Sequence, residues 1–133
     1  MKCFVDSNIF ISAGIFPNSV PAAAVMKALS PPNVAFVSDY VLDEITRVGN
    51  DKFPHKARDI ERFLYRTLFL IQRVPTPTDI ASDEAKISDI KDHPVLRAAL
   101  SVDVDVIITG DKKFIASGIT QPRLLLPTDF MNL

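Results

Sequence analysis

The chain has 133 residues, enough for one domain with a real core and too few for two independent ones. Hydrophobic residues make up 47% and charged residues 23%, which excludes a disordered tail, a collagen-like fibre and a disulfide scaffold. Fifteen basic residues against sixteen acidic ones give a net charge of −1, so the charge of the whole chain carries no nucleic-acid signature. We therefore expect one domain over residues 1–133.

The amino-terminal residues and the cysteine usage favour a cytoplasmic protein. Cys3 is the one cysteine and cannot form an internal disulfide, which fits a reducing compartment. Asp6 and Asn8 interrupt the first apolar run too early for a signal peptide. No stretch approaches the ~20 apolar residues of a membrane span, so we expect no membrane association.

Short apolar runs alternate with longer amphipathic stretches along the chain. In chain order, the pattern predicts a strand at 2–5, a helix at 20–29, a strand at 34–37, a helix from Ser38 to Gly49 and a helix at 57–71. A further helix begins at Asp92, which is a good N-cap, and strands follow at 104–109 and 123–126. This alternation, with strands that are apolar almost throughout, predicts a parallel sheet with both faces buried.

Several carboxylates fall where the ends of parallel strands can gather them. Ligands of open α/β sheets bind outside the carboxyl ends of the strands. Asp6 directly follows the first strand, and Asp111 follows the strand VDVIIT. Asp92, with Asp89 three residues before it, opens the helix that leads into that strand, and Glu44 lies about two turns into the helix after VAFV. Each acid alone is an ordinary turn, cap or solvated residue, and only their joint placement indicates a site.

Carboxylates held close together oppose folding, because like charges raise one another's pKa. A divalent cation removes that cost, and Mg²⁺ or Mn²⁺ prefers hard oxygen ligands. One cysteine and two isolated histidines are too few for a zinc site, and four glycines offer no usual phosphate loop. The pattern therefore favours a magnesium or manganese site.

Four segments, in order along nearly the whole chain, resemble the PIN domain, the nuclease fold of VapC-type toxins. They are the opening FVDSNIFISA, then YVLDEITRV with DKF, then KDHPVLRAAL with VDVIITGDKKF, and the closing LLLPTDF. The resemblance implies a three-layer α/β/α sandwich around a central parallel sheet of four to five strands. It also implies an endoribonuclease that depends on Mg²⁺ or Mn²⁺, the toxin of a type II toxin–antitoxin pair, with a small antitoxin partner and a homodimeric state.

The resemblance also assigns roles to single residues. Asp6, Glu44, Asp92 and Asp111 match the acidic catalytic quartet, and Asp6, Asp92 and Asp111 are the expected metal ligands. Supporting positions are Asn8, Thr109 and, as a secondary acid, Asp89. His93 stands where some members have another acid; we expect it to face solvent at the helix start, with a phosphate contact as the alternative.

Two basic groups are candidates for an RNA surface. The segment from Arg47 to Arg73 has seven basic and three acidic residues, 7 − 3 = +4. Within it, Arg58, Arg62 and Arg66 recur at i, i+4 and form one stripe, either a solvated helix face or a ridge that contacts phosphates. Lys112 and Lys113 adjoin Asp111 and are expected to lie near the substrate.

Two other functions fit the same fold class. One is a non-catalytic PIN-like module that binds RNA or protein. Metal-dependent cleavage of RNA separates this module from a nuclease. The other is a phosphatase-like hydrolase, which activity on a small phosphate ester without RNA cleavage would favour. Against the phosphatase, Asp6 is followed by Ser7 and Asn8 rather than by a second acid two residues on.

Overall fold

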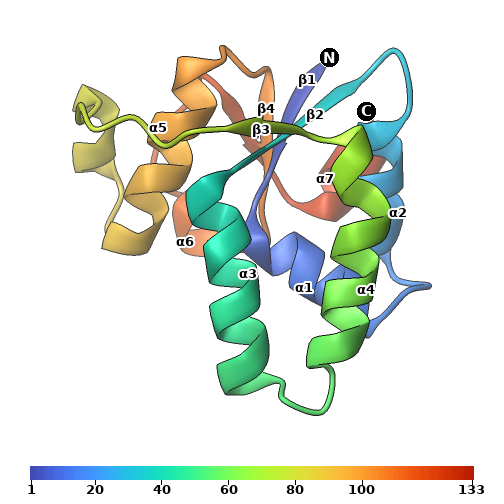
Figure 1. Ribbon diagram of the computed structural model, residues 1–133. Coiled ribbons are helices and arrows are strands. Elements are labelled where there is room, and N and C mark those ends of the chain that lie inside the picture. Colours follow the sequence, from blue (N-terminus) through green and yellow to red (C-terminus); the bar gives the residue numbers. More distant parts are fainter.

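The computed structural model describes residues 1–133 and contains one five-stranded sheet in which all strands are parallel (Figure 1). The order across the sheet is β3-β2-β1-β4-β5. The strands are β1 (Lys2–Val5), β2 (Val34–Ser38), β3 (Gln72–Val74), β4 (Val106–Ile108) and β5 (Arg123–Leu125). The predicted parallel sheet is thereby confirmed.

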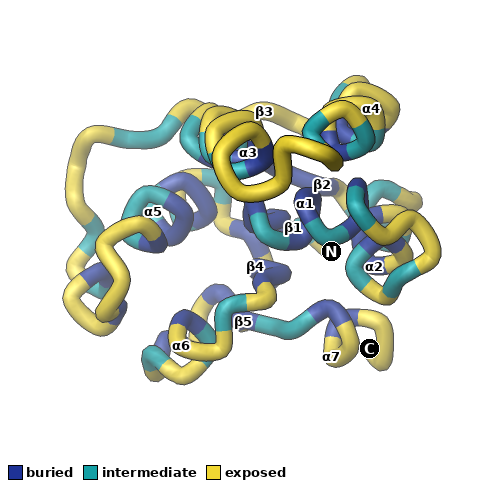
Figure 2. The backbone as a smooth tube through the Cα atoms, turned by 90° about the horizontal axis from the view of Figure 1, so that it is seen from below, coloured by how far each residue is buried: buried dark blue, intermediate teal, exposed yellow.

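Helices cover both faces of the sheet, so the molecule has three layers (Figure 2). Helix α5 lies on one face, and α1 and α2 lie on the other, while α3 and α4 stand side by side at one edge. The α-helices are α1 (Ser7–Ile15), α2 (Val20–Leu29), α3 (Asp39–Lys52), α4 (Ala57–Thr67), α5 (His93–Ser101), α6 (Lys112–Ile115) and α7 (Pro127–Met131). Short 3-10 turns occupy Leu68–Leu70, Ser82–Lys86 and Ile90–Asp92.

The two central strands are buried on both faces. Cys3, Phe4 and Val5 of β1 have no exposed surface, and neither do the three residues of β4. Phe4 stands between Phe36 of β2 and Ile107 of β4. Burial on both faces explains why these strands are continuous apolar runs rather than alternating patterns.

The order of the strands determines where a ligand can bind. From β1 the chain builds β2 and β3 on one side of the sheet, and later β4 and β5 on the other. The connections that follow β1 and β4 therefore diverge at the carboxyl ends of these adjacent strands. Such a switch point leaves a crevice, and Asp6 and Thr109 are the first residues beyond the two strands.

Three elements, α1, β3 and the short helix α6, were not predicted, and a fourth ends earlier than expected. Helix α1 is buried nearly all round, so it lacks the periodic pattern of an amphipathic helix. Strand β3 has three residues, of which only Val74 is buried. The helix expected over 57–71 ends at Thr67, whose hydroxyl donates to the carbonyl of Leu64 at 2.9 Å.

No single helix is long and apolar enough to cross a bilayer; α1 and α2 reach that length only together, across a bend of 118°.

Helices α1 and α4 cross at a glycine. A Cβ atom on Gly14 of α1 would lie 2.6 Å from the Cα atom of Ile60 in α4. Gly49 of α3 also faces Ile60, but there a Cβ atom would meet only the end of the side chain, at 3.5 Å. The absence of a side chain at Gly14 therefore sets how closely α1 approaches α4.

Candidate metal centre at the carboxyl end of the sheet

Hydrogen bonds from both sides of the switch point, from the start of α1 and from the end of β4, hold the Asp6 carboxylate. It caps α1, and its Oδ1 accepts a hydrogen bond from the Ser7 amide at 2.8 Å. Its Oδ2 accepts one from the Thr109 hydroxyl at 2.9 Å. Only 2% of Asp6 is exposed, and burial raises its pKa to about 6 in spite of these hydrogen bonds.

Asn8 and Thr109 link the ends of β1 and β4. The Asn8 carbonyl oxygen accepts from the Gly110 amide at 2.8 Å, and its amide nitrogen lies 3.4 Å from both Asp6 Oδ2 and the Thr109 hydroxyl oxygen. Thr109 Oγ1 in turn accepts from the Asp111 amide at 3.1 Å. These two polar residues therefore set the position of Asp111 relative to Asp6, as supporting residues of the site would.

Three carboxylates lie within ligand distance of one another. Oxygens of Asp89, Asp92 and Asp111 are all within 4.8 Å of each other. Asp92 is 8% exposed, and its Oδ2 is buried without any hydrogen-bond partner. Burial, together with the charges of Asp6 and Asp111, raises the pKa of Asp92 to about 8. A buried, unpartnered carboxylate oxygen among other carboxylates fits a hard divalent cation, which removes the repulsion.

Two members of this cluster also shape the backbone. Asp89 Oδ1 accepts from the Lys91 amide at 3.0 Å, and Asp111 Oδ1 accepts from the Lys113 amide at 2.9 Å. The second oxygen of each carboxylate is left for a ligand. Asp92 stands at the N-cap of α5 as predicted, but its side chain makes no capping hydrogen bond, because the 3-10 turn at 90–92 already runs into α5 with Asp92 in helical conformation.

The expected metal ligands were Asp6, Asp92 and Asp111, whereas the structure groups Asp92 and Asp111 with Asp89. Asp6 is not among these three carboxylates, and its two oxygens accept hydrogen bonds from Ser7 and Thr109. It remains near enough for its charge to raise the pKa of Asp92.

Glu44 reaches the same edge from α3. The Ser7 hydroxyl donates a hydrogen bond to Glu44 Oε1, and the charge of Glu44 contributes to the raised pKa of Asp6. The sequence reasoning gave no role to Ser7, although it lies in the DSN motif. It also passed over Tyr40, one turn before Glu44, whose pKa is raised by burial and by the Glu44 carboxylate.

His93 does not stand free in solvent at the helix start as expected, although 26% of its side chain is exposed. Its Nε2 lies 2.9 Å from the carbonyl oxygen of Ile87, and its Nδ1 lies 3.7 Å from Glu84 Oε1. The side chain therefore packs against the segment before α5, where Glu84 is buried.

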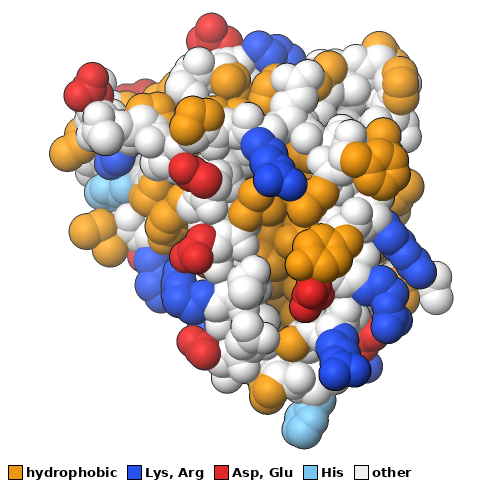
Figure 3. All heavy atoms as spheres, viewed as in Figure 1, with side chains coloured by type: hydrophobic (Ala, Val, Ile, Leu, Met, Phe, Trp, Pro, Cys, Tyr) orange, Lys and Arg blue, Asp and Glu red, His pale blue; other side chains and the backbone are white.

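The two basic groups lie in different places. Lys112 and Lys113 are exposed at the start of α6, directly after Asp111. The exposed stripe of Arg58, Arg62 and Arg66 lies on α4, which both ribbon views place across the molecule from α6. Basic side chains line the edge of the molecule over α4 (Figure 3). The stripe therefore does not adjoin the carboxylate cluster.

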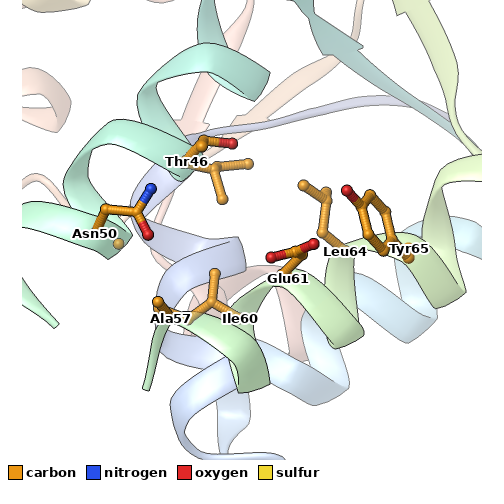
Figure 4. Close-up of a pocket in the computed structure, with 9 residues that line it drawn as sticks. Thr46, Asn50, Ala57, Ile60, Glu61, Leu64 and Tyr65 are labelled. Atoms are coloured by element: carbon orange, nitrogen blue, oxygen red, sulfur yellow. The ribbon is translucent and has the colours of Figure 1, made fainter. Parts of the chain in front are cut away.

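One hollow adjoins the carboxylates and another does not. The first is lined by residues that include Asn8, Ser12, Gly110, Asp111 and Thr128. The second lies between α3 and α4, where Thr46 and Asn50 face Glu61 and Tyr65 (Figure 4). None of the predicted acidic residues lines this second hollow, so the candidate site consists of the carboxylates and the first hollow.

Solved structures with the same fold include a VapC toxin and a VapBC complex. VapC20 of Mycobacterium tuberculosis, a toxin that cleaves the sarcin–ricin loop, is 15% identical over 88% of this chain and 95% of its own, with a TM-score of 0.62. VapBC2 of Rickettsia felis, bound to a fragment of its promoter DNA, is 14% identical over 95% of this chain and 98% of its own, with a TM-score of 0.70. PAE2754 of Pyrobaculum aerophilum is 13% identical over 99% of this chain and 88% of its own, with a TM-score of 0.62.

At these identities the structural similarity shows the fold. Among curated proteins, none matches the sequence. The sequence model of the PIN domain matches residues 2–113, which include every carboxylate of the candidate site. The chain therefore belongs to the PIN domain family.

Proposed function

We propose that this PIN domain is a metal-dependent endoribonuclease and the toxin of a type II toxin–antitoxin pair, acting on RNA in the cytoplasm. The observation that carries the proposal is Asp92 Oδ2, a buried oxygen without a partner, in a cluster with Asp89 and Asp111 at the switch point of the sheet. Family membership and the toxins that share the fold support the same function.

Asp89, Asp92 and Asp111 would hold Mg²⁺ or Mn²⁺, and Asp6 would contribute from the edge of the cluster. The oxygen-only donor set is what these cations prefer. A cation bound there supplies Lewis-acid activation of water and stabilises charge on a phosphoryl oxygen. Thr109 and Asn8 keep Asp6 and Asp111 in place before any ligand arrives.

Glu44 is placed to act on the attacking water. The Ser7 hydroxyl fixes its Oε1, so Oε2 is the atom that orients the water and accepts its proton. The water oxygen attacks the phosphorus, the bond from phosphorus to the leaving ribose oxygen breaks, and that oxygen takes up a proton from solvent. Lys112 and Lys113 neutralise phosphates of the bound strand beside Asp111.

The test is cleavage of a structured RNA with Mg²⁺ or Mn²⁺ and with a chelator. Asp6→Asn should lower the cleavage rate at least about 100-fold without changing the circular dichroism spectrum, because the charge is lost while the cap oxygen stays. Asp129→Asn, an exposed acid on α7, is the matched control. Undiminished cleavage by Asp6→Asn rejects the assignment, and tight RNA binding without cleavage by the wild type favours the non-catalytic module.

The proposed antitoxin partner and homodimer require apolar surface, and one groove offers it. Between α2 and α4, residues that include Met26 and Leu70 line a hollow, and these two side chains are about half exposed. Arg66 borders the groove, so an acidic amphipathic segment of an antitoxin fits its charge. Light scattering of the chain, alone and with the product of the neighbouring reading frame, measures both assemblies.

A further inference from the structure

An ion pair between a buried carboxylate and a partly exposed guanidinium joins α5 to the segment that precedes it. Glu84 is 1% exposed and accepts two hydrogen bonds from the Arg97 guanidinium, from Nη2 at 2.7 Å and from Nε at 3.1 Å. The Ala81 amide also donates to Glu84 Oε2. Both carboxylate oxygens are thus used, and Glu84 is not available as a metal ligand.

The same helix holds this segment at two further points. Arg97 Nη1 donates to the carbonyl oxygen of Pro77 at 3.1 Å. His93, one turn earlier on α5, lies against both Glu84 and the carbonyl oxygen of Ile87. The path of the chain from Pro77 to Ile87 is therefore fixed by side chains of α5, and Asp89 follows two residues later.

Asp89 depends on this arrangement more than the other carboxylates do. Asp92 runs directly into α5, and Asp111 caps α6. Asp89 is exposed and lies between two short 3-10 turns in a stretch without regular helix or strand. An ion pair of this kind adds little stability compared with apolar side chains of the same size, whereas its directional hydrogen bonds constrain where the segment lies.

We propose that Arg97 and Glu84 are positioning residues, which hold the segment at 77–87 so that Asp89 reaches the cluster formed with Asp92 and Asp111. This inference rests on the proposed function, since it assigns the cluster to a metal ion. Arg97 touches neither metal nor substrate, and its effect on metal binding passes through Asp89.

Binding of Mn²⁺ to the purified chain, measured by calorimetry and by electron paramagnetic resonance, tests this directly. Asp89→Asn, which alters the ligand itself, and Arg97→Gln, which removes a contact that supports it, should each weaken Mn²⁺ binding about tenfold. The double variant should bind no more weakly than either single one, because both remove the same ligand. Lys86→Gln is the matched control: it breaks an exposed ion pair with Asp83 in the same segment and should leave the affinity unchanged.

Arg97→Gln leaves Glu84 buried without its partner, so a second variant guards against loss of folding. Glu84→Met with Arg97→Met replaces the pair by apolar side chains of similar length, which buried sites tolerate. Its unfolding temperature should stay near that of the wild type while Mn²⁺ binding falls by the same factor. A role in stability alone would change the unfolding temperature and leave the affinity unaltered.

The outcomes separate this inference from the proposed function. Wild-type chain that binds no Mn²⁺ and cleaves no RNA overturns both. Wild-type chain that does both, combined with unchanged Mn²⁺ affinity in the Arg97 variants, overturns the positioning role alone. Additive losses in the double variant, or a loss with Arg97→Gln and none with Asp89→Asn, show that Arg97 does not act through Asp89 and also overturn it.

Discussion

At the scale of single residues, the two buried carboxylates of this site carry a free-energy cost when they are charged. Asp6 and Asp92 are both buried, and the pKa of each lies above the ordinary value of 3.8, at about 6 and about 8. The folded chain therefore binds more protons than the unfolded chain between pH 4 and pH 8. The stability that protonation gives is complete below about pH 4 and is lost as the pH rises through 6 and 8.

We expect the metal-free protein to unfold at a temperature several degrees lower at pH 8.5 than at pH 5.5, because Asp6 and Asp92 are both largely charged in the folded chain at pH 8.5. Adding Mg²⁺ at pH 8.5 should restore most of the difference. Asp92→Asn should flatten the pH dependence and raise the free energy of unfolding at pH 8.5 by about 1–2 kcal/mol without metal. Thermal and urea unfolding with a chelator measure these quantities, and an unfolding temperature that rises with pH would contradict them.

How far the sequence predicts the site depends on which contact is considered. The ends of β1 and β4 identify Asp6 and Asp111 as neighbours, because parallel strands bring their carboxyl ends to one edge. Asp89 and Asp92 are identified by their place at the start of the helix that leads into β4. The hydrogen bond from Ser7 to Glu44 and the pair formed by Glu84 with Arg97 depend on how helices and loops cross in space. No spacing along the chain encodes such contacts, so sequence reasoning missed them.

At the scale of elements, the crossing of α1 and α4 depends on the glycine at position 14. Gly14→Ala should destabilise the fold by about 1–3 kcal/mol, because the new Cβ atom meets the backbone of Ile60, which cannot move aside without shifting α4. Gly49→Ala is the matched control, since its Cβ atom makes an ordinary contact with the same residue and alanine favours helix. It should be neutral or slightly stabilising. Urea unfolding of both variants decides, and equal effects would refute the role of the crossing.

Elements with one buried face are predictable, whereas those buried all round or exposed at an edge are not. Helices α2 and α3 begin where their serine caps predict, with Ser19 and Ser38 accepting hydrogen bonds from the first turn. Helix α1 gives no periodic signal because it is buried on nearly every side. The short edge strand β3 is set by its pairing with β2, from Phe36↔Gln72 to Ser38↔Val74, rather than by its own residues.

At the scale of the whole molecule, a net charge of −1 conceals a separation of charge. We expect only the basic group beside the carboxylates to bind RNA. In an Asp6→Asn background, Lys112→Glu with Lys113→Glu should weaken RNA binding and reduce the slope of log Kd against log salt by about 2.

The control for this prediction is the stripe on α4. Arg62→Glu with Arg66→Glu changes charge by the same amount at a place remote from α6, and should leave the salt dependence unaltered. A lower slope in that variant would instead make the stripe part of the RNA surface. Filter binding or fluorescence anisotropy over a range of salt concentrations gives both slopes.

The pairing of β1 with β4 has a consequence for the synthesis of the protein. Cys3 lies opposite Val106, so the middle of the sheet closes only after most of the chain has left the ribosome. Asp111 follows that strand, and an incomplete chain has Asp6 and Glu44 but not the last carboxylate. If the chain cuts RNA as proposed, a ribosome that makes it is exposed to the activity only once translation is nearly finished, and prematurely terminated products are harmless.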